Sequence, residues 1–366
     1  MLNGSKLASA ENELKAEEHR KFWNREKTSR PIASFRIGNY FIATHYRAAE
    51  KILVKGTRIA PEMIDVDSFM EDYERQYQEV KALDQSGFWT AEPYPGIPWM
   101  EAFWGCEIIG NGESFISRPL VKDPSELEKL EFNIESPWAK KYFEFVVKLN
   151  KLSAGRFPVG APILRGQADT LGALLGQTEL IYALYEEPLL VRSTLNKIVD
   201  SFLHIYAGMH RLNEPFLGGS SIGFYHVWAP GESLWFQDDL SALLSPELHR
   251  EFFLENEKKI CEKYLYTMMH LHSASFHILD DVMCNENLKA IEINKDISGP
   301  DIVQMLDQFR KVLEKNFNLV ICGHLTEEDI QFLYDKLDPR GIFFTIFLED
   351  FQKAEKMNAF LKGMNR

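Results

Sequence analysis

The chain of 366 residues carries a formal net charge of −13 at pH 7, and 45% of its residues are hydrophobic. A chain of this length and composition buries a large core, either as two ordinary domains or as one large barrel. The excess of acidic residues opposes binding to nucleic acid, and no basic run of the kind that follows phosphates is present. No stretch approaches the roughly 18 consecutive apolar residues of a membrane helix, so no membrane partner is expected.

Residues 1–30 are predicted to form a helical extension that lies on the surface of the protein. Leu14, Phe22 and Trp23 stand among Glu, Lys and Arg, and the segment lacks the apolar centre of a signal peptide. The four cysteines form no CxxC pair, which favours a reduced, cytoplasmic protein over a disulfide scaffold.

From residue 31 to residue 366, short apolar runs alternate with helical stretches, as is typical of strand–helix units around a parallel sheet. Helices are predicted at 178–209, 246–263, 300–316 and 327–337. The predicted strands are 31–36, 88–92, 157–164, 221–227, 264–270, 290–293, 319–321 and 342–347. Eight strands are enough to close a TIM (β/α)8 barrel, with its pocket at the carboxyl ends of the strands. The sequence therefore predicts an α/β fold with one barrel domain over 31–366 and the extension before it.

The strand predicted at 264–270 ends in two histidines, His270 and His272. On a strand, the i, i+2 spacing places both imidazoles on one face. A parallel strand that is buried on both sides is normally apolar to its end, so this pair indicates a binding or catalytic site. The plainer alternative is a half-buried histidine that a neighbouring group satisfies.

Other candidates for the same site follow the next two strands. Glu292 and Asp296 flank the end of one strand, where buried acids are costly unless they contact a histidine, Arg36 or a metal ion. Cys322 stands where the chain leaves the strand at 319–321, and it is either an inert buried thiol or a thiol of the site.

Polar and aromatic residues at further strand ends are candidates for substrate contacts. Asp238 and Asp239 form a pair of acids that either binds a polar substrate, acts as acid and base, or caps a turn. His226 and Arg165 each end a predicted strand, and Arg165 is expected to face a substrate carboxylate or Asp169. Trp99 ends a proline-rich loop that suits the mouth of a barrel with an apolar ligand.

Five motifs, in order along the chain, resemble the uroporphyrinogen decarboxylase superfamily, which contains the decarboxylase and the cobalamin-dependent methyltransferases built on the same barrel. The motifs are PIASFR at 31–36, PWMEAFWGCE at 98–107, GQADTLGALLG at 166–176, QDDLSALLSPE at 237–247 and HLHS at 270–273. The resemblance covers most of the chain from about residue 30 onward and implies a barrel enzyme, with a homodimer as a reasonable assembly.

Within that superfamily the chain is more similar to the methyltransferase branch than to the decarboxylase. Arg36 matches the arginine that ends the first strand of the decarboxylase, but no second arginine follows to hold the carboxylate arms of a tetrapyrrole. Glu92 corresponds to the acid that faces the pyrrole nitrogens, and Asp239 matches a position of the family. His270 and His272 stand where the methyltransferases carry a His-x-Cys zinc pair.

The resemblance implies zinc held by His270 and His272, with Glu292 or Cys322 completing the set. Such a site is less thiophilic than one with cysteine ligands, so it suits an oxygen or nitrogen atom of the substrate. The expected reaction moves a methyl group from an O- or N-methylated small molecule to a corrinoid carried by a partner protein. The expected catalytic residues are Asp239, Glu92 and His226, and the expected substrate contacts are Arg36, Arg165, Asp238 and Trp99.

Two alternatives remain open at the level of sequence. In the first, the protein decarboxylates a porphyrinogen or another acid without a metal, with Arg36 and Arg165 on carboxylates and Asp239 or Glu92 on the ring. In the second, a barrel that has lost its chemistry binds a small molecule without turnover.

Overall fold

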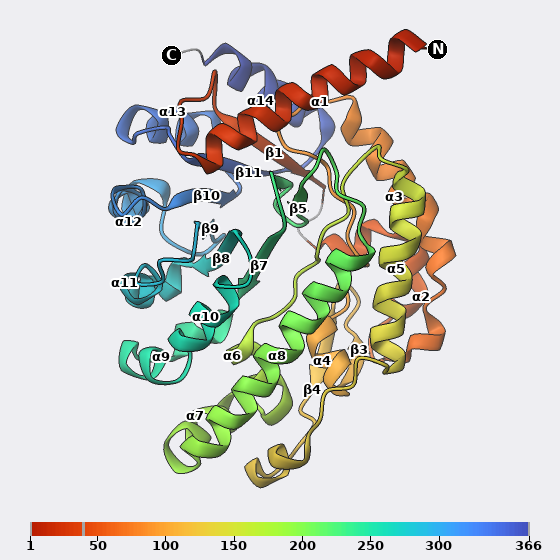
Figure 1. Ribbon diagram of the computed structural model, residues 1–366, viewed down its shortest axis with the longest axis vertical. Coiled ribbons are helices and arrows are strands. Elements are labelled where there is room, and N and C mark those ends of the chain that lie inside the picture. The colour runs from red at the N-terminus through yellow and green to blue at the C-terminus, as the bar shows by residue number, and fades with distance from the viewer. Residues whose placement is uncertain (1, 39–40, 365–366) are drawn as a thin grey trace.

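The computed structural model describes residues 2–38 and 41–364. Its centre is a parallel sheet of six strands in the order β1-β11-β10-β9-β8-β7, which curves into the main wall of a barrel (Figure 1). The strands are β1 Ile32–Ile37, β7 Ser233–Gln237, β8 Tyr266–His272, β9 Ala290–Lys295, β10 Asn318–Gly323 and β11 Ile342–Leu348. Strand β11 is buried at every position, because a wall strand packs on the barrel interior with one face and on helices with the other.

Two extended segments, 87–92 and 157–165, complete the ring between β1 and β7. Each is joined to its neighbours by one or two backbone hydrogen bonds rather than by a full ladder. The contacts are the hydrogen bond from Gly87 N to the Ala33 carbonyl and the parallel bridges Ala91–Val159 and Arg165–Gln237. The predicted barrel of parallel strands is therefore confirmed.

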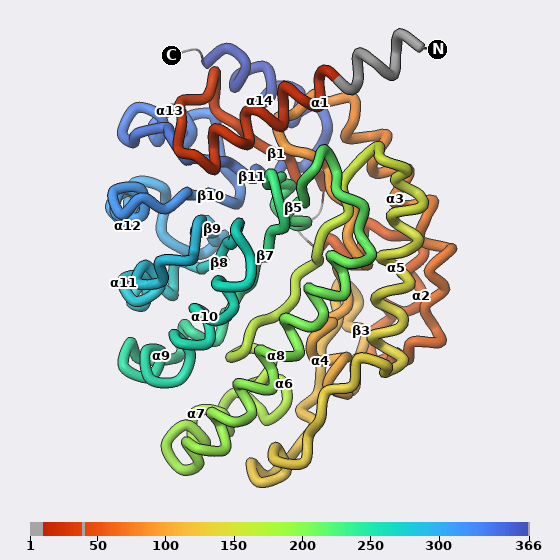
Figure 2. The backbone as a smooth tube through the Cα atoms, in the orientation of Figure 1, coloured from red at the N-terminus to blue at the C-terminus, as the bar shows by residue number. Residues whose placement is uncertain are grey.

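The strand predicted at 221–227 is wrong, because this part of the chain forms a hairpin inside the barrel. Its strands are β5 Ser220–Ile222 and β6 Val227–Ala229, which pair antiparallel. At the turn, the Tyr225 carbonyl accepts hydrogen bonds from Ser34 on β1 at 2.9 Å and from Thr345 on β11 at 3.3 Å. In Figure 2 the green trace of the hairpin accordingly lies beside β1 and β11. The wall strand that replaces the predicted one is β7.

Helices cover the outer face of the ring, and α9 to α14 lie outside the arc of strands in Figure 1. Their bounds are α1 Leu2–Trp23, α2 Glu50–Leu53, α3 Val66–Lys81, α4 Trp99–Trp104, α5 Pro137–Ser153, α6 Gln167–Leu175, α7 Gln177–Glu186, α8 Pro188–Leu212, α9 Pro246–Phe252, α10 Leu254–Cys261, α11 Leu279–Val282, α12 Ile302–Glu314, α13 Glu327–Lys336 and α14 Phe351–Gly363. A small antiparallel sheet, β2 Arg58–Ile59, β3 Glu107–Gly110 and β4 Phe115–Arg118, lies outside the barrel sheet. The helix predicted at 178–209 is divided into α7 and α8, because Pro188 lacks the N–H that a continuous helix needs and starts a new one.

The extension packs across the amino-terminal end of the barrel, as the contacts of α1 show. The ring of His19 accepts a hydrogen bond from Trp228 N at 3.1 Å, and Trp23 Nε1 donates to the Trp228 carbonyl at 2.8 Å. Phe22 and Trp23 are buried, whereas Leu14 is exposed. The predicted helical extension is confirmed, and its apolar side closes the floor of the barrel.

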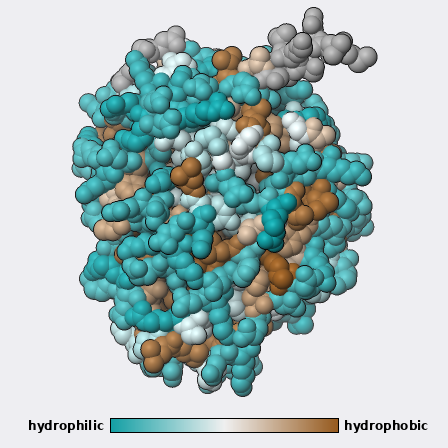
Figure 3. All heavy atoms as spheres, in the orientation of Figure 1, coloured by the Kyte–Doolittle hydropathy of each residue, from teal (hydrophilic) through white to brown (hydrophobic). Residues whose placement is uncertain are grey.

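The face of the molecule in Figure 3 is largely hydrophilic, with apolar groups scattered over it in small patches. Over the described residues, every helix falls short of the length and hydropathy that spanning a bilayer requires.

Candidate functional site

His270 and His272 lie at the carboxyl end of β8, and both rings turn toward Asp239. The distance from Asp239 Oδ1 is 3.6 Å to His270 Nε2 and 3.7 Å to His272 Nε2. The ligand atoms of the three residues all lie within 4.8 Å of one another. Two imidazole nitrogens and one carboxylate oxygen that face a common point form a donor set suited to zinc or a similar divalent ion.

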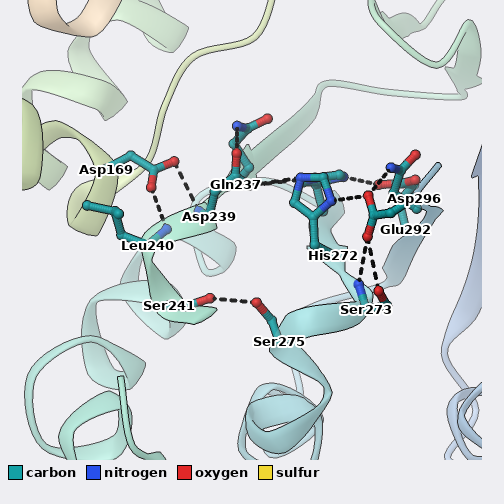
Figure 4. A network of polar contacts seen from close by, with 12 residues as sticks. Asp169, Gln237, Asp239, Leu240, Ser241, His272, Ser273, Ser275, Glu292 and Asp296 are labelled. Atoms are coloured by element: carbon teal, nitrogen blue, oxygen red, sulfur yellow. Dashed lines mark hydrogen bonds and ion pairs between the residues drawn. The ribbon is translucent and has the colours of Figure 1, made fainter. Parts of the chain in front are cut away.

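A carboxylate contacts Nδ1 of each histidine, on the side of the ring away from Asp239; Figure 4 shows this contact for His272 and Asp296. His272 Nδ1 lies 2.6 Å from Asp296 Oδ1, and His270 Nδ1 contacts Glu292 Oε2 on β9. When Nδ1 donates its proton to a carboxylate, Nε2 is the nitrogen that presents a lone pair to a metal. Both Nε2 atoms are therefore oriented toward Asp239.

The electrostatics of the two rings follow from these contacts. Burial opposes the charged form of His270, but the adjacent Glu292 carboxylate outweighs it and raises the pKa of His270 to about 9. The hydrogen bond with Asp296 raises the pKa of His272. A metal ion at this point would have to displace protons from the rings, as is general for histidine ligands.

Tyr225 reaches the same corner from the hairpin inside the barrel. Its hydroxyl lies 2.9 Å from His270 Nδ1 and donates to Glu292 Oε2 at 2.9 Å. Nothing in the sequence singles out this residue, because a tyrosine inside an apolar run is usually a core residue.

Asp239 is positioned by the turn on which it stands, a short 3-10 helix over Asp239–Leu243. The Asp169 carboxylate accepts hydrogen bonds from Asp239 N at 3.0 Å and from Leu240 N at 2.8 Å, which fixes the start of the turn (Figure 4). Gln237 Nε2 donates to Asp239 Oδ2 at 2.9 Å. These bonds leave Oδ1 of Asp239 toward the histidines.

Asp238, its neighbour in the sequence, points elsewhere. Its Oδ1 accepts a hydrogen bond from Ala168 N at 2.7 Å, at the first turn of α6. Burial, together with the nearby Asp169 carboxylate, raises the pKa of Asp238 well above its usual range. Of the two adjacent acids, one caps a helix and the other faces the histidines, so the structure does not bring Asp238 to the predicted substrate contact.

Arg165 lies close to Asp239 on the other side. Its Nη1 donates to Glu101 Oε1 at 2.6 Å; the arginine side chain is 41% exposed, whereas that of Glu101 is 1% exposed. Arg165 and Asp239 both line a cavity of about 400 Å³. The structure therefore places this predicted substrate contact beside the histidine group.

Arg36, Glu92 and His226 form a second group, around the turn of the hairpin. Arg36 Nη2 lies 3.3 Å from Glu92 Oε1, and its Nε donates to the Phe224 carbonyl at 2.8 Å. Burial raises the pKa of Glu92 to about 7 despite Arg36, and burial lowers the pKa of His226 well below its usual value. Arg36 and His226 line another cavity, of about 500 Å³.

Two of the predicted site residues lie in the packed interior. Trp99 is fully buried, donates its Nε1–H to the Tyr94 carbonyl at 3.1 Å and packs on Tyr142, so it belongs to the core rather than to a pocket. Cys322 is buried among the apolar side chains inside the barrel, and burial with the nearby Glu292 carboxylate raises the pKa of its thiol well above the usual range. A neutral thiol is a poor metal ligand.

The fold is similar to that of a solved methyltransferase from Methanosarcina mazei. The superposition has a TM-score of 0.63 at 13% sequence identity, and it covers 95% of this chain and 97% of that chain. Comparison with protein-family models gives no match, and comparison with curated proteins gives no relative. At this level of identity the likeness concerns the fold, and the function has to be argued from the site.

Proposed function

We propose that the protein is a metal-dependent methyltransferase that passes a methyl group from an O- or N-methylated small molecule to a corrinoid held by a partner protein. The observation that carries the proposal is the convergence of His270 Nε2, His272 Nε2 and Asp239 Oδ1 on one point at the carboxyl end of the barrel. The fold shared with a methyltransferase is consistent with it.

The three converging residues would hold the metal ion, and zinc is the ion proposed. Bound there, zinc would act as a Lewis acid on the oxygen or nitrogen atom that carries the methyl group. Glu292 and Asp296 keep the two imidazoles oriented through Nδ1, and Tyr225 supports Glu292. This assignment moves Glu292 from the metal ligands to the residues that position them, and it replaces Cys322 by Asp239.

Methyl transfer of this kind breaks the bond between the methyl carbon and the heteroatom, and both electrons stay on the heteroatom. A corrinoid on the partner protein would supply the electron pair for the new bond to carbon. The chain's own contribution is therefore to bind the donor and to stabilise the heteroatom that leaves. Two neutral imidazoles and a single carboxylate would leave net positive charge on a divalent ion, which would stabilise the electron pair on the heteroatom that leaves.

The test is the zinc content of the purified protein. We expect about one equivalent of zinc in the wild type and a loss of most of it in the double variant His270→Ala, His272→Ala. Asp239→Asn should lower the zinc content as well. His204→Ala, an exposed histidine on α8, is the matched control and should leave zinc unchanged.

Absence of metal from the wild type, even after incubation with zinc, would contradict the proposal. If zinc is present, methylated donors can be screened with a methyl-free corrinoid protein, and the absorption change of the cobalt centre reports transfer.

A further inference from the structure

The cavity of about 400 Å³ beside Asp239 has a size within the range of small-molecule sites. Its walls come from β4, from α6 and the chain just after it, and from the turn that carries Asp239. Phe115, Ile116 and Leu240 contribute apolar surface, and Gly172 and Ala173 line the cavity from α6. A small ligand with both apolar and polar groups suits such a lining.

Arg165 brings the positive charge to this cavity. Glu101 accepts from Nη1, and it is the one side chain to which the guanidinium donates among the described residues. A guanidinium has five N–H donors, and the Arg165 side chain is 41% exposed and lines the cavity. Glu101, which is fully buried, fixes the arginine from behind and keeps its planar group in place.

The acids near Arg165 are already engaged. Both oxygens of Asp169 accept backbone hydrogen bonds from the turn at Asp239 and Leu240. Asp239 is oriented by Gln237 and faces the histidines. The remaining donors of Arg165 are therefore available to an anion from outside the protein.

We propose that Arg165 binds a carboxylate of the substrate, so that the methyl donor is a small methylated acid. This inference rests on the proposed function: the heteroatom with its methyl group would lie at the group formed by Asp239, His270 and His272, and the carboxylate at Arg165. Arg165 and Asp239 line one cavity, and His270 and His272 lie beside Asp239. A carboxylate suits the flat, forked guanidinium, which binds it through two parallel hydrogen bonds.

The test compares acids with amides of the same shape. The probes are methoxyacetate and 3-methoxypropanoate, each paired with its primary amide, and binding to the protein as purified is measured by calorimetry. We expect at least one acid to bind about 10- to 100-fold more tightly than its amide, because the amide cannot accept a bidentate, charge-assisted pair. Equal binding of acid and amide would overturn the inference.

The variant that isolates the interaction is the pair Arg165→Gln, Glu101→Gln, because removing the arginine alone would leave Glu101 buried without a counterion. We expect it to lose the preference for the acid while its zinc content stays at the wild-type level. The control is the pair Arg192→Gln, Glu251→Gln, an ion pair on the surface whose arginine is also 41% exposed. A preference for the acid that survives in the Arg165 variant would overturn the inference.

The two proposals fail separately. A protein that prefers the acid but transfers no methyl group to any corrinoid would support the carboxylate site and contradict the proposed reaction. A protein that transfers methyl groups from the amides as well as from the acids would support the reaction and contradict the carboxylate site.

Discussion

Glu292 accepts a hydrogen bond from the Tyr225 hydroxyl and also contacts His270 Nδ1, so one imidazole depends on a residue that the inner hairpin supplies. A carboxylate behind a histidine fixes the ring and its tautomer, and the groups that hold the carboxylate matter in turn. Tyr225 is accordingly a positioning residue for the proposed metal site.

Replacing Tyr225 by phenylalanine should weaken zinc binding by about 10-fold, because Glu292 loses a hydrogen bond while the ring still fills its space. Competition with a chelating dye measures this affinity. Tyr142→Phe is the control, since that hydroxyl contacts only the sulfur of Met209, at 3.6 Å, among the contacts described for it. If the Tyr225 variant bound zinc as tightly as the wild type, Tyr225 would have no role in positioning the metal ligands.

Single residues also differ in how far the sequence could place them. The i, i+2 spacing was sufficient to predict that His270 and His272 share a face, because it follows from the geometry of one strand. The sequence could not predict that Asp238 caps α6 while Asp239 faces the histidines. This difference depends on where α6 begins, some seventy residues earlier in the chain. Contacts between distant elements decide such cases.

At the scale of elements, most wall strands were predictable and the hairpin was not. The run at 221–227 and strand β7 are both short, largely apolar and close to Pro230 and Gly231, and both are buried apart from the partly buried Phe224. Neither segment alternates between apolar and polar residues. The pattern of hydrophobic residues therefore does not show which of the two belongs to the barrel sheet. Only the structure shows that β7 is the strand that pairs with β8.

Helix α1 gives the protein a dependence of its stability on pH, through His19. The ring is fully buried, and burial lowers its pKa to about 4. Well above pH 6.5 the ring is neutral in both the folded and the unfolded chain. As the pH falls from 6.5 toward 4, the unfolded chain takes up a proton that the folded protein excludes, so folding becomes less favourable.

We therefore expect the wild type to lose about 2 kcal/mol of stability between pH 7 and pH 5 relative to a His19→Gln variant. Other groups also make stability depend on pH; Glu92, whose pKa is raised by burial, stabilises the folded protein as the pH falls. These contributions are the same in both proteins, so they cancel in the difference between the two free energies of unfolding. Urea unfolding at each pH gives both free energies. A difference that stays constant over this range would show that His19 is protonated in the folded protein.

At the scale of the whole molecule, the hairpin joins the floor, the wall and the site of the barrel. Its far end packs under α1 through Trp228, its turn is bonded to β1 and β11, and Tyr225 reaches the histidine group. Ile222 forms a parallel bridge with Ala161 in the segment that completes the ring. The stability of the barrel and the order of the site are thus expected to change together.

Gly223 is the position at which this coupling can be tested. A Cβ at this glycine would lie 2.5 Å from the Ala161 carbonyl oxygen and 2.7 Å from Glu92 Oε2, which is too close for any side chain. Gly223→Ala must therefore displace the hairpin or the ring segment, at a cost of about 1–3 kcal/mol in the free energy of unfolding. Because Tyr225 follows two residues later, the same variant should also bind zinc more weakly. Gly363→Ala, in α14 where a Cβ meets no atom within 4 Å, should leave zinc binding unchanged and should not lower the free energy of unfolding. Loss of stability with unchanged zinc affinity would mean that the hairpin supports the barrel without ordering the site, and Tyr225 would then have to keep its place independently of the turn beside it.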